Sequence, residues 1–320
     1  MKRGAKNSGA AARAHTIAVR VPASSANLGA GFDCFGLALG LYLNVRARAV
    51  AGQTEPCRVN YSGQGADSLP QTADNLIYRS ALLLAEREGI RLPPLELDVK
   101  NEIPLGGGLG SSAAAIVAGV LVGAAFARRR VPADRLLSCA ADIEGHADNV
   151  AAALHGGWVI LAQNPTSVVV VRRPWPHAIQ AVVVSPDAQV DTRASRKILN
   201  AEVSREDAVF NLQRVALFCA AIDAGRTDLL REAMRDRLHQ SQRRNLVPGL
   251  AEALELFHRP GLLGVALSGA GPSVLAFATG RCRAIGQELA AAFARHGVPA
   301  TVRVLPAGVS GARLSGRPAV

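Results

Sequence analysis

The segment PLGGGLGSSAAA, residues 104–115, constrains the fold of this chain more than any other stretch. Four of the five positions from 106 to 110 are glycine: Gly106, Gly107, Gly108 and Gly110. A tight turn needs only one or two glycines. Because glycine has no Cβ, such a backbone can approach another group closely, and its N–H groups can converge on an anion.

The residues on either side place this loop between a strand and a helix. An apolar run ends near Ile103, and an alanine-rich run follows Ser111 and Ser112, either of which can cap a helix. The first N–H groups of a helix have no partner within it, and the helix dipole adds positive potential there. The segment therefore predicts a phosphate-binding loop. The plainer alternative is a strand-to-helix turn with a serine cap.

Two common phosphate loops are excluded by their spacing. The G-x-x-x-x-G-K-[ST] pattern requires a lysine, and none occurs between Lys100 and Lys197. The G-x-G-x-x-G pattern fails because Ser111 stands where the third glycine would follow Gly106 and Gly108.

The length of the chain indicates the number of domains, and its composition indicates which classes of molecule it binds. The chain has 320 residues, which favours two domains, and carries 36 Lys and Arg against 25 Asp and Glu. The basic residues are scattered and aromatic residues make up 4%, so we expect small anionic molecules as partners and no nucleic acid. No apolar run reaches the about 20 residues of a bilayer span, so we expect no membrane association.

Cysteine usage indicates a reducing compartment. Five cysteines are spread along the chain without a C-x-x-C pair: Cys34, Cys57, Cys139, Cys219 and Cys282. Neither a zinc site nor a disulfide framework is indicated, and we expect a cytoplasmic protein. The basic N-terminus lacks the apolar core of a secretory signal, and residues 1–14 are predicted to be a disordered tail.

Strand and helix patterns mix without regular alternation, which indicates an α+β fold. We expect an N-terminal domain over 15–170, a C-terminal domain over 171–310 and a flexible tail over 311–320. Residues 22–39 look like a turn-rich loop. Helices are predicted over 73–88, from 111, over 133–156 with a break at Gly145, and over 193–200, 204–224, 226–238, 248–258 and 283–297.

Several stretches, in order, resemble one group of small-molecule kinases. The glycine loop is similar to the phosphate loop of the galactokinase, homoserine, mevalonate and phosphomevalonate (GHMP) kinases. VPASSANLGAGFDCFGLAL (21–39) and EGHADNVAAALHGG (144–157) resemble two motifs of homoserine kinases, and SGAGPSVLAF (268–277) resembles the third glycine motif of the superfamily. The similarity runs from about residue 16 to 306.

This resemblance implies the two-domain GHMP kinase fold, with an N-terminal domain like one in a ribosomal protein and a ferredoxin-like C-terminal domain. It also implies ATP-dependent phosphorylation of the side-chain hydroxyl of L-homoserine, a step of threonine biosynthesis, with Mg²⁺. A homodimer is common in the family.

The resemblance assigns a nucleotide and metal site. Residues implied to bind the phosphates are Pro104, Gly106, Gly107, Gly108, Leu109, Gly110, Ser111 and Ser112. Ser112 and Glu144 would hold Mg²⁺, which prefers oxygen ligands, and Asn75 would lie near the adenine. From the residues alone, Ser112 and Asn75 could equally be helix caps and Glu144 an exposed helix residue.

The acceptor is a zwitterion, so its site needs both signs of charge. The resemblance gives Asp33 to the ammonium group and Arg196 and Arg243 to the carboxylate, where a guanidinium offers paired hydrogen bonds. The pocket is completed by three further residues, Asn27, His146 and Thr192. Without the resemblance, each arginine would be read as a surface residue.

Asn149 stands where mevalonate kinases carry an aspartate that can act as a base. An amide cannot accept the proton, and the neighbouring Asp148 is expected to point about 100° away on the helix. We therefore expect catalysis by positioning and charge stabilisation, without a strong protein base. Two alternatives stay open: another GHMP kinase, such as a mevalonate-type kinase, and a non-enzymatic RNA-binding module.

Overall fold

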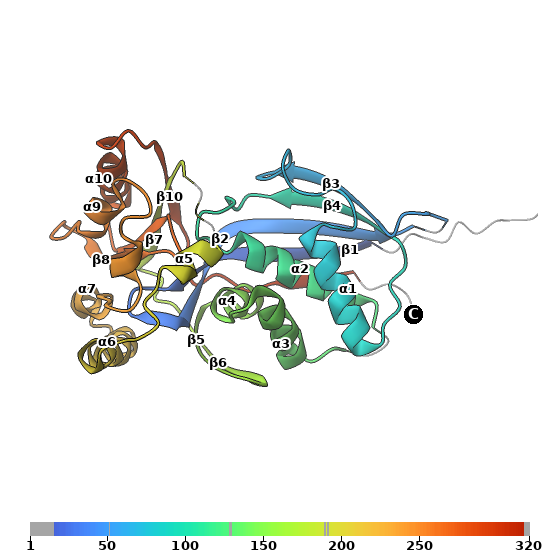
Figure 1. Ribbon diagram of the computed structural model, residues 1–320, viewed down its shortest axis with the longest axis horizontal. Helices are drawn as coiled ribbons and strands as arrows, with labels where there is room; N and C mark the ends of the chain where they lie inside the picture. The colour runs from blue at the N-terminus through green and yellow to red at the C-terminus, as the bar shows by residue number, and fades with distance from the viewer. Residues whose placement is uncertain (1–15, 51, 128–129, 189, 191, 317–320) are drawn as a thin grey trace, which may run out of the picture.

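The computed structural model describes residues 16–50, 52–127, 130–188, 190 and 192–316. The predicted N-terminal tail, 1–14, lies outside the described residues. The expected α+β architecture is confirmed: two sheets are combined with helices that segregate to particular faces (Figure 1).

The first sheet is built from the N-terminal half of the chain and one late strand. Its strands run in the order β11 (Arg313–Ser315), β1 (Thr16–Asn27), β2 (Gly31–Ala49), β4 (Leu95–Asn101) and β3 (Cys57–Gly63). Two further strands, β5 (Trp158–Asn164) and β6 (Ser167–Arg173), extend from β2. Among the strands that the structure describes, only β3 and β4 pair in parallel.

Four helices cover one face of this sheet (Figure 1). They are α1 (Leu76–Glu88), α2 (Ser111–Ala125), α3 (Ala133–Glu144) and α4 (Asp148–His155). Helix α2 packs on α1, α3, α4 and β1, and ten of its fifteen residues are buried. Its apolar, alanine-rich sequence is therefore that of a central core helix. No helix in the described part of the chain is long and apolar enough to cross a membrane.

The second sheet has the antiparallel order β10 (Ala300–Leu305), β7 (Gln180–Pro186), β9 (Val274–Ala278) and β8 (Leu262–Leu267). Alternate residues of β7 face two different cores: Val182 and Val184 pack with α9 (Leu250–Leu254) and α10 (Cys282–Ala294), and Val183 packs with the first sheet's core. The remaining helices are α5 (Thr192–Lys197), α6 (Arg205–Asp223), η1 (Thr227–Leu229), α7 (Leu230–Ala233) and α8 (Gln240–Arg243).

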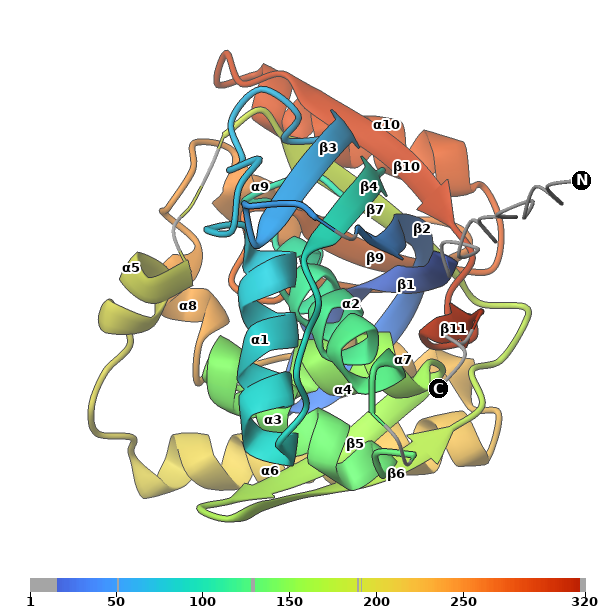
Figure 2. The ribbon, with the colours of Figure 1, turned by 90° about the vertical axis from the view of Figure 1, so that its right-hand side faces the viewer.

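Two expectations about segments that are strands in the structure were wrong. Residues 22–39 are the paired ends of β1 and β2, and only 28–30 form a turn. Seven consecutive residues of β1, from 21 to 27, are buried, so the strand lacks the alternation that reveals strands in a sequence. The segment 311–320 was expected to be a flexible tail, but β11 within it pairs with β1 at the sheet edge (Figure 2).

Candidate functional site

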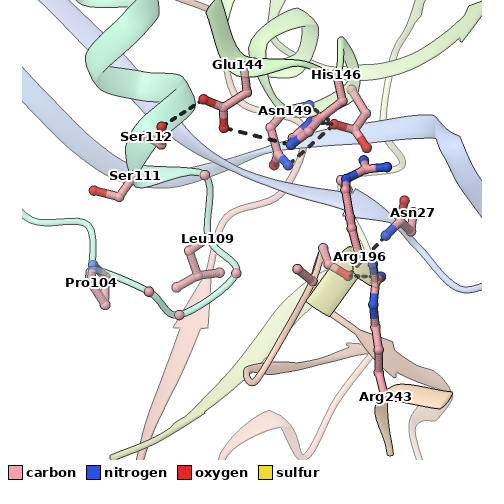
Figure 3. Close-up of a pocket in the computed structure, with 18 of the residues that line it drawn as sticks. Asn27, Pro104, Leu109, Ser111, Ser112, Glu144, His146, Asn149, Arg196 and Arg243 are labelled. Atoms are coloured by element: carbon pink, nitrogen blue, oxygen red, sulfur yellow. Dashed lines mark hydrogen bonds and ion pairs between the residues drawn. The ribbon is translucent and has the colours of Figure 1, made fainter. Parts of the chain in front are cut away.

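The glycine loop forms one wall of a cavity between the two sheets (Figure 3). The ends of β1 and β2, helices α2, α3, α4, α5 and α8, and the turn between β8 and β9 supply the other walls. The residues predicted from the sequence that line it are Asn27, Pro104, Gly106, Gly107, Gly108, Leu109, Gly110, Ser111, Ser112, Glu144, His146, Asn149, Arg196 and Arg243. Ala26, Phe32, Asp148, Gly269 and Ala270 line it as well.

Helix α2 begins differently from the expectation that Ser111 or Ser112 caps it. The N-cap is Gly110, at φ +67°, and no side chain caps the helix. A Cβ on Gly110 would stand 2.1 Å from Oγ of Ser24, so this position needs glycine for both conformation and space. Ser111 and Ser112 are therefore the first two residues of the helix, and both line the cavity.

The turn between β8 and β9, which carries the SGAGPS sequence, packs directly on the glycine loop. The Ser268 hydroxyl donates to the carbonyl oxygen of Gly108 at 2.7 Å. A Cβ on Gly108 would lie 2.2 Å from the carbonyl oxygen of Ser268. The second sheet therefore fixes the shape of the loop that the first sheet presents.

Ser112 and Glu144 meet above the loop (Figure 3). The Ser112 hydroxyl donates to Oε2 of Glu144 at 2.7 Å, and the Glu144 side chain is 12% exposed. Burial raises the pKa of Glu144, and the Ser112 hydrogen bond and the charge of His146 oppose that rise. A hydroxyl and a carboxylate oxygen are thus presented together at the N-terminus of a helix.

A network at the start of α4 lines the next part of the cavity. A hydrogen bond of 2.8 Å joins Nδ1 of His146 to Oδ1 of Asp148, and the Asn149 N–H donates to the same oxygen at 2.6 Å. Ser24 donates to Oδ1 of Asn149 at 2.9 Å. Burial lowers the pKa of His146, but its hydrogen bond to Asp148 and the nearby carboxylates outweigh burial and raise it.

The expectation that Asp148 points away from the site was wrong. It is the first residue of α4, its carboxylate turns back to His146, and it lines the cavity beside Asn149. The angular argument holds for side chains that radiate from a helix, whereas a first-turn carboxylate bonds to nearby N–H groups.

Arg196 and Arg243 enter the cavity from the second half of the chain. Arg196 donates two hydrogen bonds to Asp33, of 3.0 and 2.7 Å, and this bonding raises its pKa. Arg243 is 1% exposed, and burial together with repulsion by Arg196 lowers its pKa to about 10. Each guanidinium carbon lies 5.6 Å from the centre of the Phe32 ring. Two cations close to one aromatic ring form an anion-binding arrangement.

Buried neighbours hold Arg243 in place. Its Nε donates to the carbonyl oxygen of Ser195 at 3.2 Å, and its Nη1 donates to Nδ1 of His239 at 3.2 Å. His239 in turn donates from Nε2 to the Gly29 carbonyl at 2.9 Å, and burial lowers its pKa. A neutral imidazole therefore orients the guanidinium without adding positive charge.

Two predicted residues, Asp33 and Asn75, do not line the cavity. Asp33 accepts hydrogen bonds from Arg196, which lines the cavity, and the Asp33 N–H donates to Oδ1 of Asn27 at 3.0 Å. Asn75 caps α1 by accepting from the Ile77 N–H and donates to the Pro70 carbonyl, so the capping alternative describes its contacts. Thr192 begins α5, and its side chain lies outside the described part of the chain.

Sequence reasoning also missed Phe32, Ser24 and His239. Phe32 and Ser24 lie within the quoted stretch 21–39, so their proximity to Asp33 and Asn27 was the available signal. His239 stands four residues before Arg243, one helical turn away. Across the described residues, no group of three or more His, Cys, Asp or Glu side chains is arranged to hold a metal ion by itself.

Two family models match the chain. The GHMP kinases N terminal domain matches residues 75–157, which contain the glycine loop and the His146 network. The GHMP kinases C terminal model matches residues 218–298, which contain Arg243 and the turn that packs on the loop.

Relatives with high similarity extend over most of the chain. The homoserine kinase of Solibacter usitatus is 47% identical over 260 residues, which cover 81% of this chain and 84% of the relative. The homoserine kinase of Moorella thermoacetica is 41% identical, with 90% and 96% covered. The crystal structure of homoserine kinase from Cytophaga hutchinsonii superposes with a TM-score of 0.84 at 28% identity, over 98% of this chain and all of that chain.

Proposed function

This chain belongs to the homoserine kinases of the GHMP kinase superfamily, and we propose that it transfers the γ-phosphoryl group of ATP to the side-chain hydroxyl of L-homoserine. The products are O-phospho-L-homoserine and ADP. One observation carries the proposal: the glycine loop with the N-terminus of α2, two arginines and two carboxylates line the same cavity. The arginines are Arg196 and Arg243, and the carboxylates are Glu144 and Asp148.

ATP binds with its phosphates along residues 104–112. The backbone N–H groups of the loop and of the first turn of α2 donate to the phosphate oxygens, and the dipole of this fifteen-residue helix favours the negative charge. The loop is rigid because Ser268 and Ser24 pack against it, so little ordering is needed when the nucleotide binds.

The donor set beside the loop fits Mg²⁺. Magnesium is held by one or two carboxylates together with substrate phosphates, and here one carboxylate, Glu144, lies 2.7 Å from the hydroxyl of Ser112. Ser112 and Glu144 would hold the ion, which supplies neutralisation of the phosphate charge during transfer. A dedicated cage of protein ligands is not required.

The acceptor binds as a zwitterion between the arginines and the carboxylates. Its carboxylate takes hydrogen bonds from Arg196 and Arg243. Its ammonium group lies between Asp33 and Asp148. Arg196 then gives up part of its hydrogen bonding to Asp33, which frees that carboxylate for the ammonium group. Asn27, His146 and Thr192 complete this pocket.

The chemistry proceeds by alignment of the hydroxyl with the γ-phosphorus. A bond forms from the homoserine oxygen to phosphorus, the bond to the β-phosphate oxygen breaks, and the hydroxyl proton passes to a phosphate oxygen or to water. Asp148 already accepts hydrogen bonds from His146 and from the Asn149 N–H, so its role is to orient these groups. Asn149 positions the hydroxyl, and no strong protein base takes part.

We further propose a cytoplasmic homodimer that serves threonine biosynthesis. The five free cysteines suit a reducing compartment, and family members form homodimers. Light scattering coupled to size-exclusion chromatography measures the state of assembly directly.

An acceptor panel tests the proposed function. With ATP and Mg²⁺, phosphate-ester formation is measured with L-homoserine, L-serine and mevalonate, which has a carboxylate but no ammonium group. The proposal predicts that homoserine is the best acceptor by kcat/KM. Turnover with mevalonate but not homoserine would overturn the choice of acceptor. Salt-sensitive RNA binding without ATP turnover would overturn the kinase assignment altogether.

A further inference from the structure

Helix α6, at the periphery of the molecule, carries apolar side chains on both of its sides (Figure 1). On the inner side, the ring of Phe218 packs against those of Phe35 and Trp158. A helix on a protein surface ordinarily exposes polar residues on its other side. The outer side of α6 instead exposes Val209 and Leu212, which are 44% and 69% exposed. Leu212 is the most exposed of the large hydrophobic side chains that the structure describes.

The exposed residues of the outer side form one narrow stripe. Successive residues of a helix turn by about 100°, so residues three or four apart lie on the same side. Six exposed residues of α6 follow this spacing and fall within an arc of about 80°. This outer stripe consists of Arg205, Val209, Leu212, Ala216, Ala220 and Asp223. It is apolar along its middle, with a cation at its N-terminal end and an anion at its C-terminal end.

The outer stripe is complementary to itself when two copies of the helix run antiparallel. Around a two-fold axis near Arg214, each residue faces the residue that lies equally far from this position on the other helix. Leu212 then meets Ala216 of the partner subunit, which sets a large side chain against a small one. Arg205 meets Asp223 of the partner subunit, which sets a cation against an anion. A parallel pair would instead bring like charges together at both ends.

The charged ends of the outer stripe are available for such contacts. Arg205 makes no ion pair with any residue that the structure describes. Asp223 accepts from Arg173 of β6 through Oδ1, and its Oδ2 accepts from no described residue. Complementary charges across an interface fix its orientation and exclude other arrangements.

Further apolar surface lies at the C-terminal end of α6. Val169 and Val171 are 55% and 53% exposed on β6, on the same face of the strand as Arg173, which bonds to Asp223. In the antiparallel arrangement this end meets the N-terminal end of the partner helix, where Val203 is 50% exposed. A specific interface buries about 1,200–2,000 Å², and these valines add area to a helix pair that is about 28 Å long.

We propose that two copies of this chain meet at the outer stripe of α6, with the two helices antiparallel around a two-fold axis near Arg214. The inference rests on the homodimer proposed above and names the surface that forms it. A helix that lies on a membrane carries basic residues along its polar side. The outer stripe ends in Asp223 and is flanked by the exposed Glu206, so a second copy fits it better than an anionic lipid surface.

Substitution at the centre of the stripe tests the surface. Sedimentation equilibrium measures the dissociation constant of the dimer for the unsubstituted protein, Leu212→Glu and Leu82→Glu. Leu82 is the matched control, because it is a leucine exposed at 38% on α1. Leu212→Glu buries two unpaired carboxylates in the dimer, so we expect its dissociation constant to rise at least about hundredfold. Leu82→Glu should change it less than about threefold. Leu212 does not line the acceptor cavity, and circular dichroism checks that each variant is folded.

Charge reversal tests the antiparallel direction, and it also serves if Leu212→Glu aggregates. Arg205→Glu sets a carboxylate against Asp223 of the partner subunit, and Asp223→Arg sets two guanidiniums together. Each change alone should weaken the dimer about tenfold, and the double variant should recover to within about threefold of the unsubstituted protein. Because Asp223→Arg also removes the contact with Arg173, recovery in the double variant is the decisive result.

Three results would overturn the proposal. The first is an unsubstituted protein that is a monomer at every concentration. The second is a Leu212→Glu dimer as tight as that of the unsubstituted protein, because the subunits would then meet elsewhere. The third is a double charge variant as weak as either single variant, because the helices would then not run antiparallel.

Failure of the proposed function would look different. Phosphorylation of homoserine by a protein that sediments as a monomer would support the kinase assignment and overturn the surface. A dimer that Leu212→Glu dissociates, but that phosphorylates no homoserine, would support the surface and overturn the acceptor assignment.

Discussion

Arg196 and Asp33, 163 residues apart in the sequence, form an ion pair with two hydrogen bonds of 3.0 and 2.7 Å at the edge of the cavity. Each was expected to bind one end of a zwitterion, and without the acceptor they neutralise each other. An amino acid can replace this contact by offering an ammonium to Asp33 and a carboxylate to Arg196. The pair therefore prepares the site for a molecule that carries both charges.

Asp33→Asn should weaken homoserine binding selectively. The amide keeps the shape but loses the charge that attracts the ammonium group, so we expect the KM for homoserine to rise about tenfold or more. The KM for ATP should change less than twofold. Asp228→Asn is the matched control, because Asp228 forms a two-bond pair with Arg226 on the exposed surface. Steady-state kinetics with both substrates varied measure the effect, and an unchanged homoserine KM would contradict the role of Asp33.

Glu144→Gln should weaken the binding of Mg²⁺. The amide can still accept from Ser112 but offers no negative charge to the ion, so the Mg²⁺ concentration for half-maximal activity should rise at least about tenfold. Glu86→Gln, on the exposed side of α1, is the control. A normal Mg²⁺ dependence in Glu144→Gln would remove this residue from the metal site.

Activity should fall at acidic pH in a way that depends on magnesium. Burial raises the pKa of Glu144, so this carboxylate takes up a proton at a higher pH than the about 4.3 of an ordinary glutamate. The proton and Mg²⁺ compete for it, and a higher Mg²⁺ concentration should therefore move the acid limb of kcat/KM to lower pH. An acid limb that does not respond to Mg²⁺ concentration would assign it to another group.

His146 should stabilise the fold most strongly at low pH. Its pKa is raised in the folded protein because the hydrogen bond to Asp148 and the nearby carboxylates outweigh burial. This contribution is complete below the unfolded pKa of about 6.5 and is lost as the pH rises through the folded pKa. Urea unfolding should thus show a larger loss of unfolding free energy for His146→Gln at pH 6 than at pH 9. An equal loss at both pH values for His146→Gln would contradict the account.

Gly110→Ala should damage the loop far more than the strain at its backbone alone. Gly89, which ends α1, has a nearly equal φ of +64° but open space around it, so Gly89→Ala measures the conformational cost, about 1–2 kcal/mol. In Gly110→Ala the new Cβ also clashes with Ser24, which should at least double that loss and abolish measurable ADP binding. Urea unfolding and calorimetry check both effects. Equal stability losses in the two variants would mean that the contact with Ser24 can relax.

The sequence predicted the glycine loop from its own residues because the signal is local. Four glycines before an apolar helix allow positive φ angles and close approach of another group whatever the rest of the fold. The loop, Ser111 and Ser112 all line the cavity. The charged residues were different: Arg196 and Arg243 reach this loop through the topology of the second sheet. Only the resemblance to a family predicted that Arg196 and Arg243 belong to this site.

Two errors have a common physical origin in hydrogen bonding at helix starts. Asp148 was excluded by an angle that applies within a helix, yet its carboxylate at the first turn bonds to Asn149 and His146. Ser111 and Ser112 were expected to cap α2, but Gly110 in a left-handed conformation begins it. How a helix begins depends on neighbours from distant segments, here Ser24, which packs against Gly110, and Glu144, which accepts from the Ser112 hydroxyl. A single sequence does not reveal these neighbours.

The most direct test of the account is a crystal structure of this protein with a non-hydrolysable ATP analogue, Mg²⁺ and L-homoserine. The account predicts that the phosphates lie against the backbone of residues 106–112, with the homoserine carboxylate at Arg196 and Arg243 and its hydroxyl facing the γ-phosphorus beside Asn149. Phosphates bound elsewhere, with residues 106–112 making no contact with the nucleotide, would contradict it.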